Sequence, residues 1–291
     1  MPVSLIRWSV FASYLLIACP QLSSALPCSR GQSPQQEPAL SKDQQEATDA
    51  LNQGVEAFKN AQFDEAERLF QRAKQLDPSL QNASLYLATI YASQYIPGAP
   101  SEDNQQRAKL AVSEYKEVLR GDPQNLSAID GIASILYQMA GQPFAPELFA
   151  ESKTYYQKHI ELKPQDPQPY YSVGVIDWAL AYRESTKLRD EFNKSVGGEG
   201  LKPGDPLPEA IRRTYAEDFG PTIDEGIASL KRAIELKPDY DDALTYLNLL
   251  YRRKADVVST ADEREELTKM ADDLLDHVKD IKMKKAGLPE Q

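Results

Sequence analysis

The chain has 291 residues, of which 41% are hydrophobic and 26% charged, and its formal net charge at pH 7 is −11. A negative chain repels a phosphate backbone, and its lysines and arginines are scattered among acids instead of forming a basic stripe with aromatic residues. We therefore expect no nucleic-acid partner.

The first residues have the pattern of an export signal. Arg7 precedes an apolar run at 8–18, WSVFASYLLIA, which has the length of a signal-peptide core and is too short to span a bilayer. We therefore expect export to the periplasm or cell envelope.

Two processing routes are open. The residues Leu16-Ile17-Ala18-Cys19 resemble a bacterial lipobox, in which case residues 1–18 are removed and Cys19 carries the lipid. Ser23-Ser24-Ala25 instead offers small residues for ordinary cleavage, which makes 1–25 the signal peptide. Membrane attachment is expected only through this N-terminal lipid.

A linker is predicted at 26–40, where proline, glutamine and serine are frequent. The second cysteine of the chain, Cys28, lies in this segment, and no cysteine follows it. An internal disulfide framework is therefore not expected beyond the linker, and stability must come from helix packing.

The segment 47–80 has the pattern of two short antiparallel helices. Its small and aromatic residues recur at helical spacing, and a proline follows the second helix: Gly54, Ala57, Ala66, Phe70, Ala73 and Pro78. Small residues let two helices approach closely, and Phe70 fills the space that remains. These residues resemble the tetratricopeptide repeat (TPR) family. The resemblance implies an all-α fold, a right-handed superhelical solenoid of antiparallel helix pairs.

Four looser copies follow, so that the solenoid is predicted at 41–284 with a tail at 285–291. Their predicted ranges are 81–125, 126–166, 167–240 and 241–284. Three of them end at a proline (Pro123, Pro164 and Pro238), and the last, without one, is expected to cap the stack. The second copy has an enlarged turn at 93–106 and the third at 140–146.

The fourth copy contains an insertion at 179–221. It is expected to lengthen the first helix through 182–196, pass through a Gly/Pro loop and add a short helix at 208–218. Its arginines (Arg183, Arg189, Arg212 and Arg213) can form salt bridges to the acidic repeats or to a partner, and internal pairing is the preferred interpretation.

Three residue pairs have the spacing of a capping box at a helix start. They are Ser41 with Gln44, Thr222 with Glu225, and Thr260 with Glu263.

Catalysis has little support, because the chain contains only two histidines and the predicted repeats contain no cysteine. His277 follows Asp273 at helical spacing, and the preferred interpretation is a polar helix face. His159 replaces a small residue of the repeat, which predicts widened packing with the ring hydrogen-bonded to backbone. The Gly-rich run at 196–206 lacks the ending of a phosphate loop. No catalytic residue, cofactor or metal site is predicted.

The resemblance implies a concave groove lined by the first helix of each repeat. Its predicted binding residues are Leu51, Val55, Phe58, Leu85, Tyr137, Tyr171, Val175, Trp178 and Arg252. The same register adds Thr89, Asp130, Ser134, Thr245, Leu249 and Arg253. None is lysine or asparagine, which argues against the carboxylate clamp of chaperone-binding members. As an alternative to a role in binding, about half of the aromatic residues of the groove can instead pack against neighbouring helices or the chain's own insertions.

These observations favour a non-enzymatic scaffold of the cell envelope that binds a protein or peptide in an apolar and aromatic groove. A second hypothesis is a lipid-anchored assembly factor for outer-membrane proteins, because the chain is similar to a five-TPR lipoprotein of the β-barrel assembly machinery. A third is an enzyme that uses a groove histidine. The sequence does not identify the partner.

Overall fold

The computed structural model describes residues 40–202 and 204–287, and within these ranges it contains ten helices and no strand. The chain divides into a unit of residues 1–39 and a unit that begins at Leu40. The predicted signal segment, Cys19 and almost all of the predicted linker lie outside the described residues.

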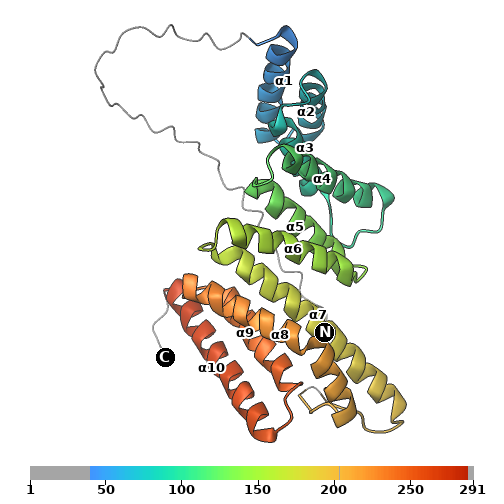
Figure 1. Cartoon of the computed structure of the whole chain (residues 1–291), viewed down its shortest axis with the longest axis vertical. Coiled ribbons are helices and arrows are strands. Elements are labelled where there is room, and N and C mark those ends of the chain that lie inside the picture. The colour runs from blue at the N-terminus through green and yellow to red at the C-terminus, as the bar shows by residue number, and fades with distance from the viewer. Residues whose placement is uncertain (1–39, 203, 288–291) are drawn as a thin grey trace, which may run out of the picture. The chain divides into compact units, whose positions relative to one another are not determined.

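The helices form five consecutive pairs (Figure 1). The first helices are α1 (Lys42–Lys59), α3 (Gln81–Gln94), α5 (Leu126–Gly141), α7 (Pro167–Ser195) and α9 (Asp241–Ala255). The second helices are α2 (Phe63–Leu76), α4 (Glu102–Gly121), α6 (Pro146–Leu162), α8 (Glu209–Leu236) and α10 (Ala261–Lys285).

Each pair packs against the next. Besides the contacts within pairs, α2 contacts α3, α4 contacts α5, α6 contacts α7 and α8 contacts α9. The predicted all-α solenoid of antiparallel helix pairs is therefore confirmed.

Small residues bring paired helices together. Ala66 and Ala73 of α2 are fully buried, as is Phe70, whose ring lies against Gly54 of α1. A Cβ atom added at Gly54 would lie 2.6 Å from Phe70 Cε1. The aromatic ring therefore occupies the place that any other side chain at position 54 would need.

Two of the three predicted capping boxes are confirmed. At α1, Gln44 N donates to Ser41 Oγ over 3.2 Å, and Ser41 N donates to Gln44 Oε1 over 2.9 Å. The same reciprocal bonds join Thr260 and Glu263 at the start of α10. Both devices satisfy backbone N–H groups that a helix start leaves without an intrahelical partner.

The predicted helix start at Thr222 is wrong, because Thr222 lies inside α8 with Pro221 just before it. The short helix expected at 208–218 is instead the first part of α8. A proline within a helix removes one hydrogen-bond donor, which would have paired with the carbonyl of Glu217. Pro221 and Glu217 are both exposed, so water can hydrate that carbonyl and the helix continues.

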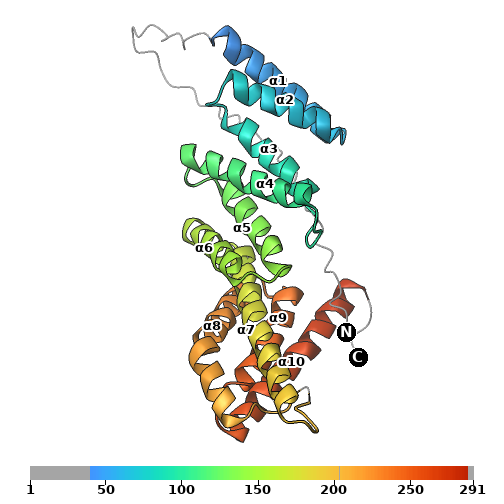
Figure 2. The same ribbon diagram turned by 90° about the vertical axis from the view of Figure 1, so that its right-hand side faces the viewer.

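The predicted lengthening of α7 is confirmed, since the helix continues to Ser195. Figure 2 shows α7 and α8 side by side, and the two helices are in contact. Tyr215 of α8 is buried, and its hydroxyl donates to the carbonyl of Ala181 over 2.8 Å. The insertion is therefore packed into the fold as an extension of the fourth pair.

An internal ion pair attaches this extension to the fifth pair, as expected for Arg189. Its guanidinium lies 2.7 Å from Asp256 Oδ1, at the end of α9, and also donates to the carbonyl of Asp205. Arg253 lies 2.7 Å from the other carboxylate oxygen of Asp256, to which Ser185 also donates a hydrogen bond. A buried carboxylate thus receives donors from both α7 and α9.

None of the helices in residues 40–202 and 204–287 combines the length and apolar composition that a membrane span requires.

The close contact at Gly54 predicts a large effect of one methyl group. We expect Gly54→Ala to lower the free energy of unfolding by roughly 1–3 kcal/mol, because the new Cβ must displace the Phe70 ring in a packed interface. Urea denaturation followed by circular dichroism measures the change. Gly141→Ala is the matched control, since a Cβ there meets no atom within 4 Å. A Gly54→Ala protein as stable as the Gly141→Ala protein would contradict this account of the packing.

Candidate functional site

The predicted groove residues lie on α1, α3, α5, α7 and α9, the first helices of the five pairs. Some neighbouring first helices touch one another directly, since α3 contacts α5 and α7 contacts α9. We call the partly exposed side chains of these helices the first-helix face; its members are Val55, Phe58, Leu85, Thr89, Ser134, Tyr137, Trp178, Tyr182, Thr245, Leu249 and Arg252.

Three residues expected in the groove lie in the core instead. Leu51 and Tyr171 are 8% exposed and Val175 is 3% exposed. Tyr171 packs against two tyrosines of the next pair, with ring centroids 5.0 Å from Tyr240 and 5.8 Å from Tyr246. These side chains hold successive helix pairs together and are covered from solvent.

Other groove candidates are partly accessible and also make internal contacts. Phe58 meets Phe63 edge to face, with centroids 5.7 Å apart, and Tyr137 meets Phe149 in the same way at 5.5 Å. Leu85 packs on the core of the first three pairs. Phe58 and Tyr137 thus pack against the chain's own helices, as expected for part of the groove's aromatic residues.

The most exposed aromatic residue of the face, Tyr182, forms a stacked pair with Trp178 on α7. Trp178 is half-buried, and its ring lies 5.2 Å from that of Tyr182 with an interplanar angle of 17°. Tyr246 of α9 supports Trp178 from the side, at 5.1 Å and 73°. Tyr182 is 45% exposed. The pair therefore presents flat, preorganised aromatic area next to solvent.

Sequence reasoning missed Tyr182, because it was assigned to the insertion. Its spacing from Trp178 was the available signal, since side chains four residues apart lie on the same face of a helix.

The arginines at the end of the face are engaged within the chain. Arg252 lies 2.6 Å from Asp272 Oδ1 on α10, and Arg253 pairs with Asp256. The Arg253 guanidinium also lies 5.9 Å from the centroid of the Tyr182 ring. The charges of both arginines are thus largely neutralised, while Arg253 also makes a cation–π contact with Tyr182.

His159 has a carboxylate partner where a backbone partner was expected. Its Nδ1 lies 2.6 Å from Asp130 Oδ1 of α5, and its Nε2 lies 3.3 Å from Asp166 Oδ2, outside hydrogen-bond geometry. The ring is 5% exposed. Burial raises the pKa of Asp130, and the hydrogen bond from His159 opposes that rise. Asp130, a predicted groove residue, is therefore occupied in joining α5 to α6.

The second histidine, His277, is exposed on α10. Among residues 40–202 and 204–287, no group of three or more histidine, cysteine, aspartate or glutamate residues is arranged to hold a metal ion.

A charge network between α6, α7 and α8, centred on a buried aspartate, had no sequence signal. Lys153 Nζ lies 2.6 Å from Asp177 Oδ1 and 2.8 Å from Glu225 Oε2. The Asp177 side chain is fully buried, and its Oδ2 has no hydrogen-bond partner within the described residues. Burial raises the pKa of Asp177 to about 7, although Lys153 acts in the opposite direction.

Comparison with known proteins agrees with the architecture. The chain matches no protein-family model. Type IV pilus assembly protein PilF of Pseudomonas aeruginosa is 22% identical over 156 residues, which are 53% of this chain and 55% of PilF. The chain thus matches about half the length of this curated relative.

Two solved structures of MamA are similar in fold. MamA of Desulfovibrio magneticus RS-1, from its residue 41 onward, has a TM-score of 0.54 at 14% identity, covering 84% of this chain and 98% of that one. Another MamA structure has a TM-score of 0.53 at 15% identity, covering 85% and 98%. At these identities the likeness concerns the fold, and it confirms the predicted TPR-like helical solenoid.

The raised pKa of Asp177 predicts a pH-dependent stability. The folded state binds a proton with a pKa near 7, whereas an unfolded aspartate has a pKa near 3.9, so the folded state holds more protons between these values. The free energy of unfolding should therefore fall as pH rises from 5 to 6.5, by up to about 1.4 kcal/mol per pH unit relative to Asp177→Asn. Urea denaturation at each pH measures this difference.

Asp49→Asn, at an exposed position of α1, is the control for the charge change and should follow the wild-type pH profile. A constant difference between wild type and Asp177→Asn across this range would show that Asp177 does not titrate there.

Proposed function

We propose that this chain is a non-enzymatic scaffold that binds a protein or peptide segment on its first-helix face. The stacked Trp178 and Tyr182 rings are the observation that carries the proposal. Aromatic residues with one face packed and another near solvent supply much of the energy of protein recognition. Trp178 is supported by Tyr246, so little side-chain entropy is lost when a partner covers the pair.

The neighbouring residues suit such a contact. Leu249 of α9 is half-buried beside the aromatic cluster, and the Arg253 guanidinium lies over the Tyr182 ring. A partner would gain apolar burial from the rings and a cation–π or polar contact from the guanidinium. Recognition by shape and apolar burial requires no bond chemistry.

Structural roles account for the groups that an enzyme hypothesis would use. His159 is buried and bonded to Asp130 within the third helix pair, and burial raises the pKa of Tyr246 on α9 to about 12, which keeps this phenol protonated. These features support binding over catalysis by the groove residues.

The proposal includes the cell envelope as location. Its support is the apolar run at 8–18 behind Arg7, which has signal-peptide length, together with the 22% identity to a pilus assembly protein.

Replacement of Tyr182 tests the proposed surface. We expect Tyr182→Asp to reduce recovery of the bound partner about tenfold or more, because it removes exposed aromatic area and adds a charge that must be desolvated. The measurement is affinity capture from crosslinked envelope extract with quantification by mass spectrometry.

Leu275→Asp on α10 is the control, since Leu275 is 37% exposed and the added charge is the same. Thermal melting of both variants checks that the fold is retained. Equal recovery of every captured protein by Tyr182→Asp and Leu275→Asp would reject the first-helix face as the binding surface.

A second candidate function is a lipid-anchored assembly factor. The likeness to a protein named for pilus assembly favours it, and the lipobox-like residues before Cys19 supply the anchor. Such a factor would hold its partner near the membrane through the linker.

Lipid labelling separates this candidate from a soluble scaffold. In a Gram-negative host we expect the wild-type chain to incorporate labelled palmitate and to sediment with membranes, and Cys19→Ser to do neither. Cys28→Ser is the matched control and should behave as wild type. An unlabelled wild-type chain in the soluble fraction would eliminate the anchored form.

A further inference from the structure

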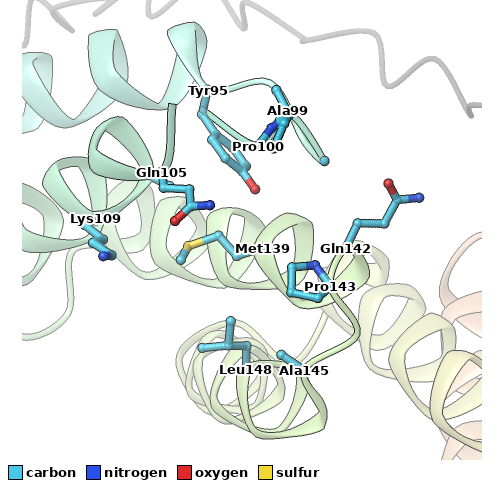
Figure 3. Close-up of a pocket in the computed structure, with 12 residues that line it drawn as sticks. Tyr95, Ala99, Pro100, Gln105, Lys109, Met139, Gln142, Pro143, Ala145 and Leu148 are labelled. Carbon is cyan, nitrogen blue, oxygen red and sulfur yellow. The ribbon is translucent and has the colours of Figure 1, made fainter. Parts of the chain in front are cut away.

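A cleft of about 380 Å³ lies between the two enlarged turns, and none of its lining residues belongs to the first-helix face. One turn joins α3 to α4 and the other joins α5 to α6, and the lining residues come from these two turns and from α4, α5 and α6 (Figure 3). Figure 3 shows Tyr95 on one side of the cleft and Leu148 on the other, with Met139 between them. The volume is within the range of sites that bind small ligands or single side chains.

The α3–α4 turn is held in position by one buried side chain. Asn104 Nδ2 donates to the carbonyls of Ile96 and Ala99 over 2.8 and 3.0 Å, and its Oδ1 accepts from Ile96 N over 2.7 Å. Gly98 has a φ of +78°, and a Cβ there would lie 2.6 Å from Gln142 Oε1. The two turns therefore approach each other at Gly98, and the cleft is present without a ligand.

The lining combines an apolar interior with a selective charge. Tyr95, Met139 and Leu148 supply the apolar surface. Lys109 is exposed at the cleft, and the lining contains no aspartate or glutamate. In a chain of net charge −11, a cleft with one cation and no acid is complementary to an anionic group next to an apolar one.

Two amides and one exposed apolar side chain favour a polypeptide as the occupant. Gln105 and Gln142 line the cleft, and each carboxamide has both a donor and an acceptor, as a peptide group has. Ile96, next to Tyr95 in the same turn, is 65% exposed and adds apolar surface to this turn. A ligand that uses both surfaces must be longer than one residue.

We infer that this turn cleft is a second recognition site, which takes an apolar side chain of a partner polypeptide next to an acidic residue of the same segment. The apolar side chain enters between Tyr95 and Leu148 against Met139. The adjacent carboxylate pairs with Lys109, and the amides of Gln105 and Gln142 bond the backbone. None of these residues belongs to the first-helix face, so this site can exist whether or not that face binds a partner.

Methionine NMR tests this inference directly, because the chain has four methionines and Met139 lines the cleft, whereas Met270 and Met283 lie on α10. The full chain, labelled with ¹³C at the methionine methyl groups, is titrated with a blocked hexapeptide that contains leucine next to aspartate. We expect a saturable shift of the Met139 signal and no shift of the Met270 and Met283 signals. A peptide with lysine in place of the aspartate, or with serine in place of the leucine, should bind about tenfold more weakly or not at all.

Variants test the role of each part. Lys109→Glu should weaken binding about fivefold or more, whereas Lys269→Glu, an equivalent charge change on α10, should have no effect. Leu148→Trp should fill the cleft and abolish the Met139 shift while the Met270 and Met283 signals show that α10 remains folded.

Three results would overturn the inference. The first is a Met139 signal that no peptide shifts, and the second is equal binding by Lys109→Glu and Lys269→Glu. The third is sodium hexanoate binding as tightly as the leucine–aspartate peptide, which would assign the cleft to a small amphiphilic anion.

Discussion

The structure depends on close contacts between helices, in which a large side chain of one helix packs against a glycine of another. Phe70 lies against Gly54 within the first pair, and Leu230 lies against Gly174 within the fourth. The same arrangement joins different pairs, because Tyr115 of α4 lies against Gly131 of α5. This spacing sets the angle and distance of each step, and so it decides which side chains of the first helices are covered and which remain at the surface.

Close packing also explains why the polar groups in the middle of the chain are so strongly perturbed. Where α6, α7 and α8 meet, Lys153 forms direct ion pairs with Asp177 and Glu225. Gly226 lets α8 approach the Cβ atom of Asp177 closely. A charge in such a place has little access to water, and its ionisation depends on one lysine. The packing that stabilises the solenoid therefore makes its centre sensitive to proton concentration.

The fold could be predicted from the sequence because its signals are local. Glycine and alanine at helical spacing around Phe70, and the reciprocal caps at Ser41 and Thr260, involve residues of one pair. Thr222 shows the limit, since capping-box spacing also occurs inside a helix and an exposed proline does not end α8.

Surface positions were harder to predict. Tyr171 has the register of a groove residue, but Tyr240, distant in sequence, covers it. The turn cleft likewise requires two turns to meet in space, which no local pattern encodes.

The ion pair between Arg189 and Asp256 has a consequence for how the chain unfolds. In a regular repeat array each unit contacts its neighbours through a similar interface, and the ends can fray one unit at a time. Here the α7–α8 extension contacts the end of α9, so loss of α9 would leave the partly buried Arg189 without its counter-ion and would break up the apolar cluster that Tyr215 and Leu207 share with residues of α9. These contacts couple the fourth and fifth pairs, and we expect them to oppose the stepwise fraying that a solenoid otherwise permits at its C-terminal end.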